Sequence, residues 1–182
     1  SVGPAAPEVE DAPPWFDHPR FIEAMADRAA AALREIPEVE RQATPIVFTA
    51  HSVPKAMADA SPYVEQFTAS SRLVAERLCH SRWMVAYQSR SGAPTDPWLG
   101  PDVGDAIGTL AAEGARHVVV VPIGFVSDHV EVLYDLDVEA KALARRAGVQ
   151  FHRALTANDH PAFIEMLGDL VRRARSGSAV RR

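Results

Sequence analysis

Short apolar runs alternate with amphipathic stretches along most of this chain. Residues 117–123 (HVVVVPI) form an unbroken apolar run rich in β-branched side chains, which is typical of a strand buried on both faces of a parallel sheet. Three further apolar runs predict strands at 45–50, 83–88 and 150–155. Apolar residues at helical spacing predict helices at 19–36, 62–78, 102–113, 130–147 and 161–174.

These elements follow one another as one helix and then four strand-helix units. Helices of such lengths can make the right-handed crossovers that connect parallel strands. We therefore expect an α/β fold, a three-layer doubly wound sheet of four parallel strands in the flavodoxin-like order 2-1-3-4. The 182 residues suit one domain. We expect it to span 15–175, after a flexible, Pro- and acid-rich linker at 1–14 and before a disordered basic tail at 176–182.

Composition excludes several classes of function. The net charge is −5, and the basic residues are scattered except at the C-terminus, so the basic patch of a nucleic-acid-binding protein is missing. Cys79 is the single cysteine, which excludes an intrachain disulfide and an all-Cys zinc or iron-sulfur site within one chain. No apolar run approaches the roughly 20 residues of a membrane span, and the N-terminus lacks the features of a signal peptide. We expect a cytoplasmic protein.

Candidate chemistry gathers at the carboxyl ends of two predicted strands. In the expected order the first and third strands are neighbours, and ligands bind outside that end of such sheets. His51 follows the first strand and Glu131 follows the third, so the two side chains should face each other across one crevice. An imidazole opposite a carboxylate can hold a divalent metal transiently and accept protons. Two protein ligands are too few for a structural zinc site, which indicates a metal in transit.

Two more acids follow Glu131 at four-residue steps, Asp135 and Glu139. On a helix this spacing stacks the three carboxylates on one face, where like charges repel. Such a stripe is either a solvated helix face or a path held for cations. Its position beside His51 favours the path.

Other residues carry weaker signals. Ser52 adjoins His51 but lacks the G-x-S-x-G elbow of serine hydrolases, so we expect its hydroxyl to satisfy the loop backbone. Residues 89–101 form a Gly- and Pro-rich loop, and loops of this length in compact domains are usually functional. Tyr87 and Trp98 either offer flat apolar surface to an aromatic ligand or belong to the core.

Three separated stretches resemble, in order and spacing, the C-terminal half of the ferrochelatases, which insert ferrous iron into a porphyrin. They read FTAHSVP at 48–54, YQSRSGAPTDPWLGPDVGD at 87–105 and VVVVPIGFVSDHVEVLYDLD at 118–137. The resemblance runs over about 15–171 and implies a chelatase-like half domain.

The resemblance implies roles for the residues at the two strand ends. His51 matches the active-site histidine of the family, and Glu131 matches the glutamate that faces it across the porphyrin plane. Ser127, Asp128 and His129 match the S-D-H-x-E motif that positions this glutamate.

The resemblance extends to the acidic stripe and to the pocket. Asp135 and Glu139 match an acidic ladder that relays protons or metal, on a helix that contains a π-type distortion in this family. At the first rung this chain has Asp where many relatives have Glu. We also expect Ser52, Ser89 and Trp98 to line the porphyrin pocket.

Substrates and cofactors are implied in the same way. Porphyrin and ferrous iron are the expected substrates, in haem biosynthesis, with no tightly bound cofactor. The C-terminal cysteines of some relatives are missing, so no iron-sulfur cluster is expected. The Ala- and Arg-rich composition resembles that of actinobacterial members, which favours coproporphyrin III over protoporphyrin IX.

The chain contains nothing that corresponds to the N-terminal half of these enzymes, which supplies much of the porphyrin pocket. The leading hypothesis is ferrochelatase activity, and the alternative is an isolated half-chelatase that binds porphyrin, haem or metal without turnover. A missing N-terminal half or a second copy of the chain could complete the pocket, the latter as a small homodimeric chelatase. A cobalt chelatase is a weaker hypothesis, because no second histidine lies beside His51.

Overall fold

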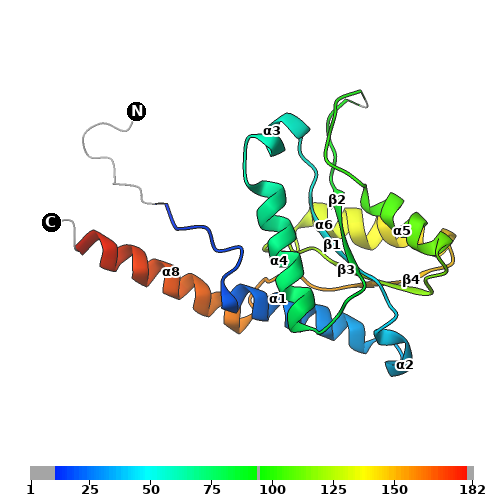
Figure 1. The fold of residues 1–182 in the computed structure, drawn as a ribbon, viewed down its shortest axis with the longest axis horizontal. Coiled ribbons are helices and arrows are strands. Elements are labelled where there is room, and N and C mark those ends of the chain that lie inside the picture. The colour runs from blue at the N-terminus through cyan, green and yellow to red at the C-terminus, as the bar shows by residue number, and fades with distance from the viewer. Residues whose placement is uncertain (1–10, 94, 180–182) are drawn as a thin grey trace.

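A parallel sheet forms the centre of the computed structural model, which describes residues 11–93 and 95–179. The strands are β1 (Ile46–His51), β2 (Trp83–Gln88), β3 (His117–Val121) and β4 (Gln150–Arg153). All neighbours pair in parallel, in the order β2-β1-β3-β4. The predicted strand order is therefore confirmed, and so is the α/β class (Figure 1).

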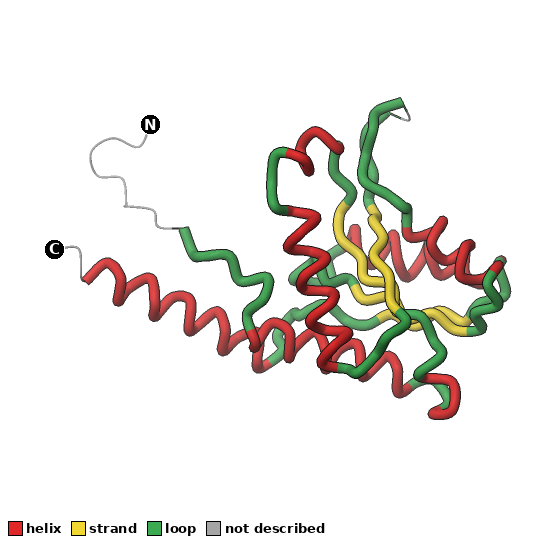
Figure 2. The backbone as a smooth tube through the Cα atoms, viewed as in Figure 1, coloured by secondary structure: helices red, strands yellow, loops and turns green. Residues whose placement is uncertain are grey.

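Helices cover both faces of the sheet (Figure 2). One face packs against α1 (Pro19–Arg34), α4 (Tyr63–Arg77) and α8 (Pro161–Ala179). The other face packs against α5 (Val103–Ala112) and against a composite helix made of α6 (Val130–Val132), η1 (Leu133–Ala140) and α7 (Lys141–Arg146). The arrangement is the expected three-layer fold.

The apolar run in β3 is explained by this layering. Val119 and Val121 belong to the cluster that packs on α1 and α8, whereas Val118 and Val120 belong to the cluster under α5 and η1. All four are fully buried, because successive side chains of a strand point to opposite faces and both faces are covered here.

The helix predicted at 130–147 is not a regular α-helix. Residues Leu133–Ala140 are π-helical, with i to i+5 hydrogen bonds and a wider turn than an α-helix. Most π-helical segments are single-turn bulges, often at functional sites, and this one is eight residues long. Apolar periodicity predicted a continuous helix, and the π-type distortion implied by the family resemblance is present.

Several boundaries differ from the prediction. His51 is the last residue of β1 rather than the first residue of a loop. Two short helices were not predicted, α2 (Glu38–Arg41) and α3 (Lys55–Asp59). Helix α8 continues to Ala179, so part of the segment predicted as a disordered tail is helical. Most of the predicted linker, residues 1–10, and the last part of the predicted tail, 180–182, lie outside the described residues. Within the described ranges, no helix combines the length and apolar character that crossing a membrane requires.

Gly124 lets the chain after β3 approach the end of β1 closely. A Cβ atom at Gly124 would lie 2.5 Å from Ala50 Cβ and 2.7 Å from Ala50 Cα. We expect Gly124→Ala to lower the free energy of unfolding by about 1–3 kcal/mol, because backbone must shift to make room. Gly108→Ala is the control. Its Cβ would meet no heavy atom within 4 Å, and it should stabilise α5 by about 0.5–1 kcal/mol. Urea denaturation of both variants checks the pair, and equal stabilities would contradict the steric account.

Candidate functional site

His51 and Glu131 meet at the carboxyl ends of β1 and β3. His51 Nε2 lies 3.2 Å from Glu131 Oε1, although the two residues are 80 positions apart in sequence. The side chains remain 35 % and 45 % exposed, so molecules from solvent can reach both. The two side chains that were predicted to face each other are thus in contact in the structure.

The hydrogen bonds of His51 fix the position of its protons. His51 Nδ1 lies 2.5 Å from the backbone carbonyl oxygen of Ser52. A carbonyl only accepts hydrogen bonds, so Nδ1 carries the hydrogen and donates it. The neutral ring therefore presents the lone pair of Nε2 to the Glu131 carboxylate. Two acceptors at this distance repel each other unless a proton or a cation lies between them. The pair can therefore hold a proton or a cation between the two atoms.

The separation of the two atoms also suits a metal ion held only briefly. Nitrogen and oxygen atoms 3.2 Å apart can be adjacent ligands of one ion at about 2.0–2.2 Å from each. Among the described residues, no group of three or more His, Cys, Asp or Glu side chains is placed to hold a metal ion. An ion on His51 and Glu131 would keep open positions for water or for another ligand.

The family resemblance implies that Glu131 faces His51 across the porphyrin plane, and this stays a prediction. A macrocycle between the two side chains would need contacts of about 3.5 Å on each side. The observed 3.2 Å is roughly half of that total. At this separation the two side chains leave no room for a macrocycle between them.

Asp128 anchors the turn that carries Glu131. Its carboxylate accepts hydrogen bonds from Arg153 Nη1 at 2.8 Å and from Asn158 Nδ2 at 2.7 Å. Its backbone N–H donates to Asn158 Oδ1 at 2.9 Å. Burial alone would raise the pKa of Asp128, but the Asn158 hydrogen bond, the Arg153 charge and the Thr156 N–H together lower it below its usual value. Asp128 therefore stays ionised and ties the motif to the end of β4.

This lowered pKa makes Asp128 a source of pH-dependent stability. A depressed folded-state pKa stabilises the fold fully above the unfolded value of about 3.9, and the stabilisation is lost as pH falls through the folded value. We expect Asp128→Asn to lower the free energy of unfolding at pH 7 by about 1–3 kcal/mol, since it leaves Arg153 with a weaker partner. The loss should shrink as the pH falls below 4.

Thermal or urea unfolding between pH 2.5 and 7 checks the Asp128 prediction. Glu113→Gln is the control, because Glu113 pairs with Arg82 at 3.6 Å and is 56 % exposed. Exposed ion pairs of this kind contribute little to the free energy of unfolding. An Asp128→Asn protein with the pH profile of wild type would contradict the assignment.

The other two residues of the S-D-H-x-E motif, Ser127 and His129, make a backbone hydrogen bond and a contact between aromatic rings. The carbonyl oxygen of Ser127 accepts a hydrogen bond from the N–H of His129 at 3.0 Å, which closes the turn before α6. The rings of His129 and Phe125 meet edge to face with centroids 5.5 Å apart, and the ring of His51 lies 6.4 Å from Phe125. Phe125 is buried and was not predicted as a site residue.

Asp135 and Glu139 line a cavity of about 190 Å³ beside α5. Glu131 turns toward His51 instead, so the three acids do not form one uniform face. Ser89 Oγ donates a hydrogen bond to Asp135 Oδ2, so Ser89 belongs to the acidic cavity. Asp102 also lines it. Partial burial raises the pKa of Asp102, and the charges of Asp105 and Asp135 add to this effect against the lowering hydrogen bond from the Gly104 N–H.

Ser52 and Trp98 have roles in loop structure. Ser52 is buried, and its hydroxyl donates to the carbonyl oxygen of Leu99 at 2.8 Å. This contact matches the expected backbone role rather than the expected pocket role. Trp98 bridges to Pro54, and a Cβ at Gly92 would lie 2.2 Å from Trp98 Nε1. The indole therefore packs against the backbone of its own loop.

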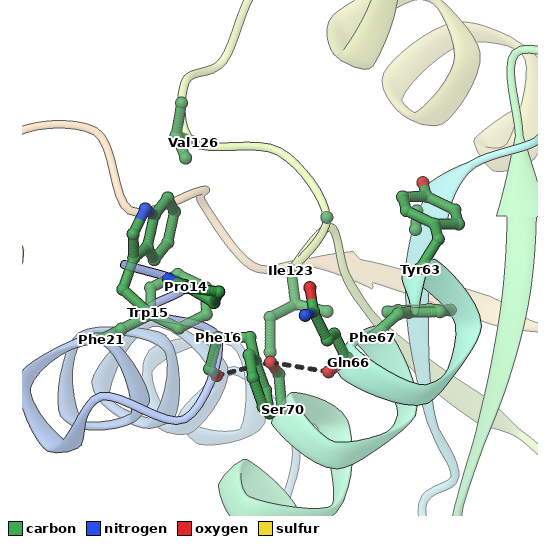
Figure 3. Close-up of a pocket in the computed structure, with 12 residues that line it drawn as sticks. Pro14, Trp15, Phe16, Phe21, Tyr63, Gln66, Phe67, Ser70, Ile123 and Val126 are labelled. Atoms are coloured by element: carbon green, nitrogen blue, oxygen red, sulfur yellow. Dashed lines mark hydrogen bonds between the residues drawn. The ribbon is translucent and has the colours of Figure 1, made fainter. Parts of the chain in front are cut away.

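A second, apolar hollow of about 290 Å³ lies on the other side of the β1 end (Figure 3). Ala50 lines it, and neighbouring residues of a strand point to opposite faces, so the His51 side chain is outside it. Tyr63 lines the hollow and donates its hydroxyl hydrogen to the carbonyl oxygen of His51 at 2.9 Å. Burial, with a contribution from Tyr87, raises the pKa of Tyr63 despite this hydrogen bond. The hydroxyl therefore remains a donor that holds the end of β1.

Comparison with known proteins places the chain in one family. The ferrochelatase family model matches residues 3–175. The chain is 48 % identical over 171 residues to the ferrochelatase of Rhodopirellula baltica, which covers 93 % of this chain and 48 % of that protein. It is 43 % identical over 185 residues to the coproporphyrin III ferrochelatase of Mycolicibacterium smegmatis, which covers 100 % and 54 %. It is 46 % identical over 190 residues to that of Nocardia farcinica, again with 100 % and 54 % coverage.

The chain thus spans about half the length of the curated relatives that it matches. The matched part contains the His51–Glu131 pair and the acidic residues that follow it. On the extent of the family match and on these identities, the chain belongs to the ferrochelatase family.

Proposed function

We propose that this chain carries the metal-inserting site of a ferrochelatase and places ferrous iron in a porphyrin. One observation supports this above all: the lone pair of His51 Nε2 and the carboxylate of Glu131 converge to 3.2 Å at an open strand end. Such a pair binds a dication or a proton, and metal insertion needs both abilities. Ferrous iron is then a substrate, and we assign the chain no resident cofactor or iron-sulfur cluster.

The His51–Glu131 pair can account for one of the two protons that metal insertion releases. A free-base porphyrin releases two pyrrole protons when it takes up Fe²⁺. Iron on His51 and Glu131 displaces the proton that the two side chains otherwise share. When iron passes to the macrocycle, the vacated pair accepts one pyrrole proton in return, as a general base near neutral pH would. The second proton must leave by another route.

Asp135 and Glu139 provide that second route in our proposal. Both residues follow Glu131 on the composite helix and line the cavity beside α5. Ser89 donates a hydrogen bond to the Asp135 carboxylate. Carboxylates with exposed neighbours can pass protons outward and attract hydrated cations inward. The shorter Asp135, where many relatives have Glu, keeps the same charge with less reach.

We propose coproporphyrin III as the substrate, in haem biosynthesis. The support is that the similar Mycolicibacterium and Nocardia proteins are coproporphyrin III ferrochelatases. The name of the Rhodopirellula ferrochelatase does not specify a porphyrin. The rates with coproporphyrin III and with protoporphyrin IX must therefore be compared directly.

Because the chain matches only about half the length of its relatives, binding without turnover is the main alternative function. His51 and Glu131 are more than a third exposed, as expected of a site whose covering half is supplied from elsewhere. The chain alone could therefore bind porphyrin, haem or metal without turnover. A separate N-terminal half or a second copy of the chain would then complete the pocket.

An anaerobic metalation assay on the chain as given tests the proposal. The chain is titrated with coproporphyrin III and with protoporphyrin IX, ferrous iron is added, and the Soret and Q bands are followed while the mass in solution is measured. We expect insertion above the uncatalysed rate, faster with coproporphyrin III. Porphyrin binding without insertion would support the binding function and overturn the proposal for the isolated chain.

A further inference from the structure

Arg153 contacts two acids on either side of the segment that carries Glu131. Its side chain extends from the end of β4 and is only 12 % exposed. Nη1 donates to Asp128 Oδ1 at 2.8 Å, and Nε donates to Asp137 Oδ1 at 2.8 Å. One guanidinium therefore joins the turn before α6 to the middle of the π-helix.

The segment between these two contacts contains two of the candidate site residues. Residues 129–136 include Glu131 and Asp135, and they run through α6 into η1. The side chain of Glu131 is 45 % exposed and contacts His51. Little packing holds that carboxylate, so its direction depends on where the backbone of the segment lies.

The sheet provides a fixed reference for that backbone. Arg153 pairs with Val120 in the register of β3 and β4, and the neighbouring β3 pairs with β1, which ends at His51. Arg153 and His51 thus stand on the same rigid sheet. By fixing Asp128 and Asp137, Arg153 fixes the Glu131 segment relative to the imidazole.

The contact also favours the π-helical form. An α-helix turns by about 100° per residue, and the wider π turn rotates less. Relaxation of residues Leu133–Ala140 to an α-helix would turn Asp137 to a new direction relative to Asp128. Both bonds to Arg153 could not then persist. A planar fork of donors matches two carboxylates at once, which a lysine ammonium cannot do equally well.

We propose that Arg153 is a positioning residue that holds the π-helical segment in place and so directs Glu131 toward His51. This inference rests on the proposed function for the meaning of the pair, but the geometry that it predicts can be measured without turnover.

The test compares Arg153→Met with Arg153→Lys, Asp137→Asn and a remote control, Arg82→Met. Arg82 lies before β2, at the opposite end of the strands, and contacts the Ala43 carbonyl and Glu113. The first readout is the ¹⁵N chemical shifts of the His51 ring, with Glu131→Ala as the reference for a lost carboxylate. The second is kcat and KM for coproporphyrin III metalation.

We expect the His51 ring shifts of Arg153→Met to move most of the way toward those of Glu131→Ala. kcat should fall by about 10–100-fold, as for other groups that orient metal ligands, with KM for porphyrin changed less than about twofold. Asp137→Asn and Arg153→Lys should lie between wild type and Arg153→Met. Arg82→Met should match wild type in both readouts.

Unchanged His51 shifts in Arg153→Met would overturn the inference, as would a loss of activity that appears only in KM. If Arg153→Met does not fold, Asp137→Asn removes only one arm of the contact and decides the question in the same way. If the wild-type chain proves inactive, the proposed function fails, and the His51 shifts still accept or reject the positioning role.

Discussion

Replacing His51 with Ala is expected to slow iron insertion by about 10²–10⁴-fold, the range typical of a lost general base. The substitution removes the nitrogen that exchanges a metal ion for a pyrrole proton. It also leaves Glu131 without its partner. The side chain is 35 % exposed, so the free energy of unfolding should change by less than about 1 kcal/mol. Single-turnover metalation, followed by absorbance, measures the effect.

His18→Asn is the matched control for His51. His18 caps α1 by accepting a hydrogen bond from the Arg20 N–H, and Asn is also a good N-cap residue. This variant should metalate at the wild-type rate. A His51→Ala protein that keeps more than about a tenth of the wild-type rate would remove His51 from the proposed chemistry.

Glu131→Gln is expected to slow insertion by more than about 100-fold, because it replaces a proposed metal ligand. Loss of a group that only orients such a ligand already costs about 10–100-fold. Gln has nearly the same shape, so the change isolates the charge. Its amide can donate a hydrogen bond to His51 Nε2, which would occupy the lone pair that iron and protons need. Porphyrin affinity should stay near wild type.

Stopped-flow metalation and a porphyrin fluorescence titration check the Glu131 prediction together. Glu165→Gln is the control, since Glu165 is 59 % exposed and pairs with Arg20 on the outer helices. Insertion within tenfold of wild type in Glu131→Gln, or a large loss of porphyrin affinity, would contradict the role assigned to the carboxylate.

The sequence alone was enough to predict that His51 and Glu131 meet. Apolar runs located the four strands, and parallel order with right-handed crossovers placed the ends of β1 and β3 side by side. The buried β3 run was the strongest signal, because four consecutive fully buried valines fit only a strand covered on both faces.

Contacts that join distant residues could not be predicted in this way. Arg153 ends the fourth strand and Asn158 follows it, and their role depends on the short approach to Asp128. A lone basic residue at the end of a strand next to β3 was the available signal. Phe125 appeared only as part of an apolar run. The side chains of Ser52 and Trp98 turn to the loop backbone for steric reasons that spacing does not reveal.

The distance between His51 and Glu131 could be learned only from the folded structure. Family resemblance implied opposite faces of the porphyrin, whereas the two side chains contact each other directly in the structure. The π-helix begins two residues after Glu131 and changes the directions of the side chains that follow, Asp135 and Glu139 among them, relative to an α-helix. Periodicity cannot distinguish the two helix types over so short a segment.

A double-mutant cycle on single-turnover metalation tests most directly whether His51 and Glu131 work as one unit. Groups that act together are strongly non-additive. We predict that His51→Ala/Glu131→Gln inserts iron no more than about threefold slower than the slower of the two single variants. A double variant whose rate loss equals the product of the two single losses would show that the residues act independently, and would contradict the account.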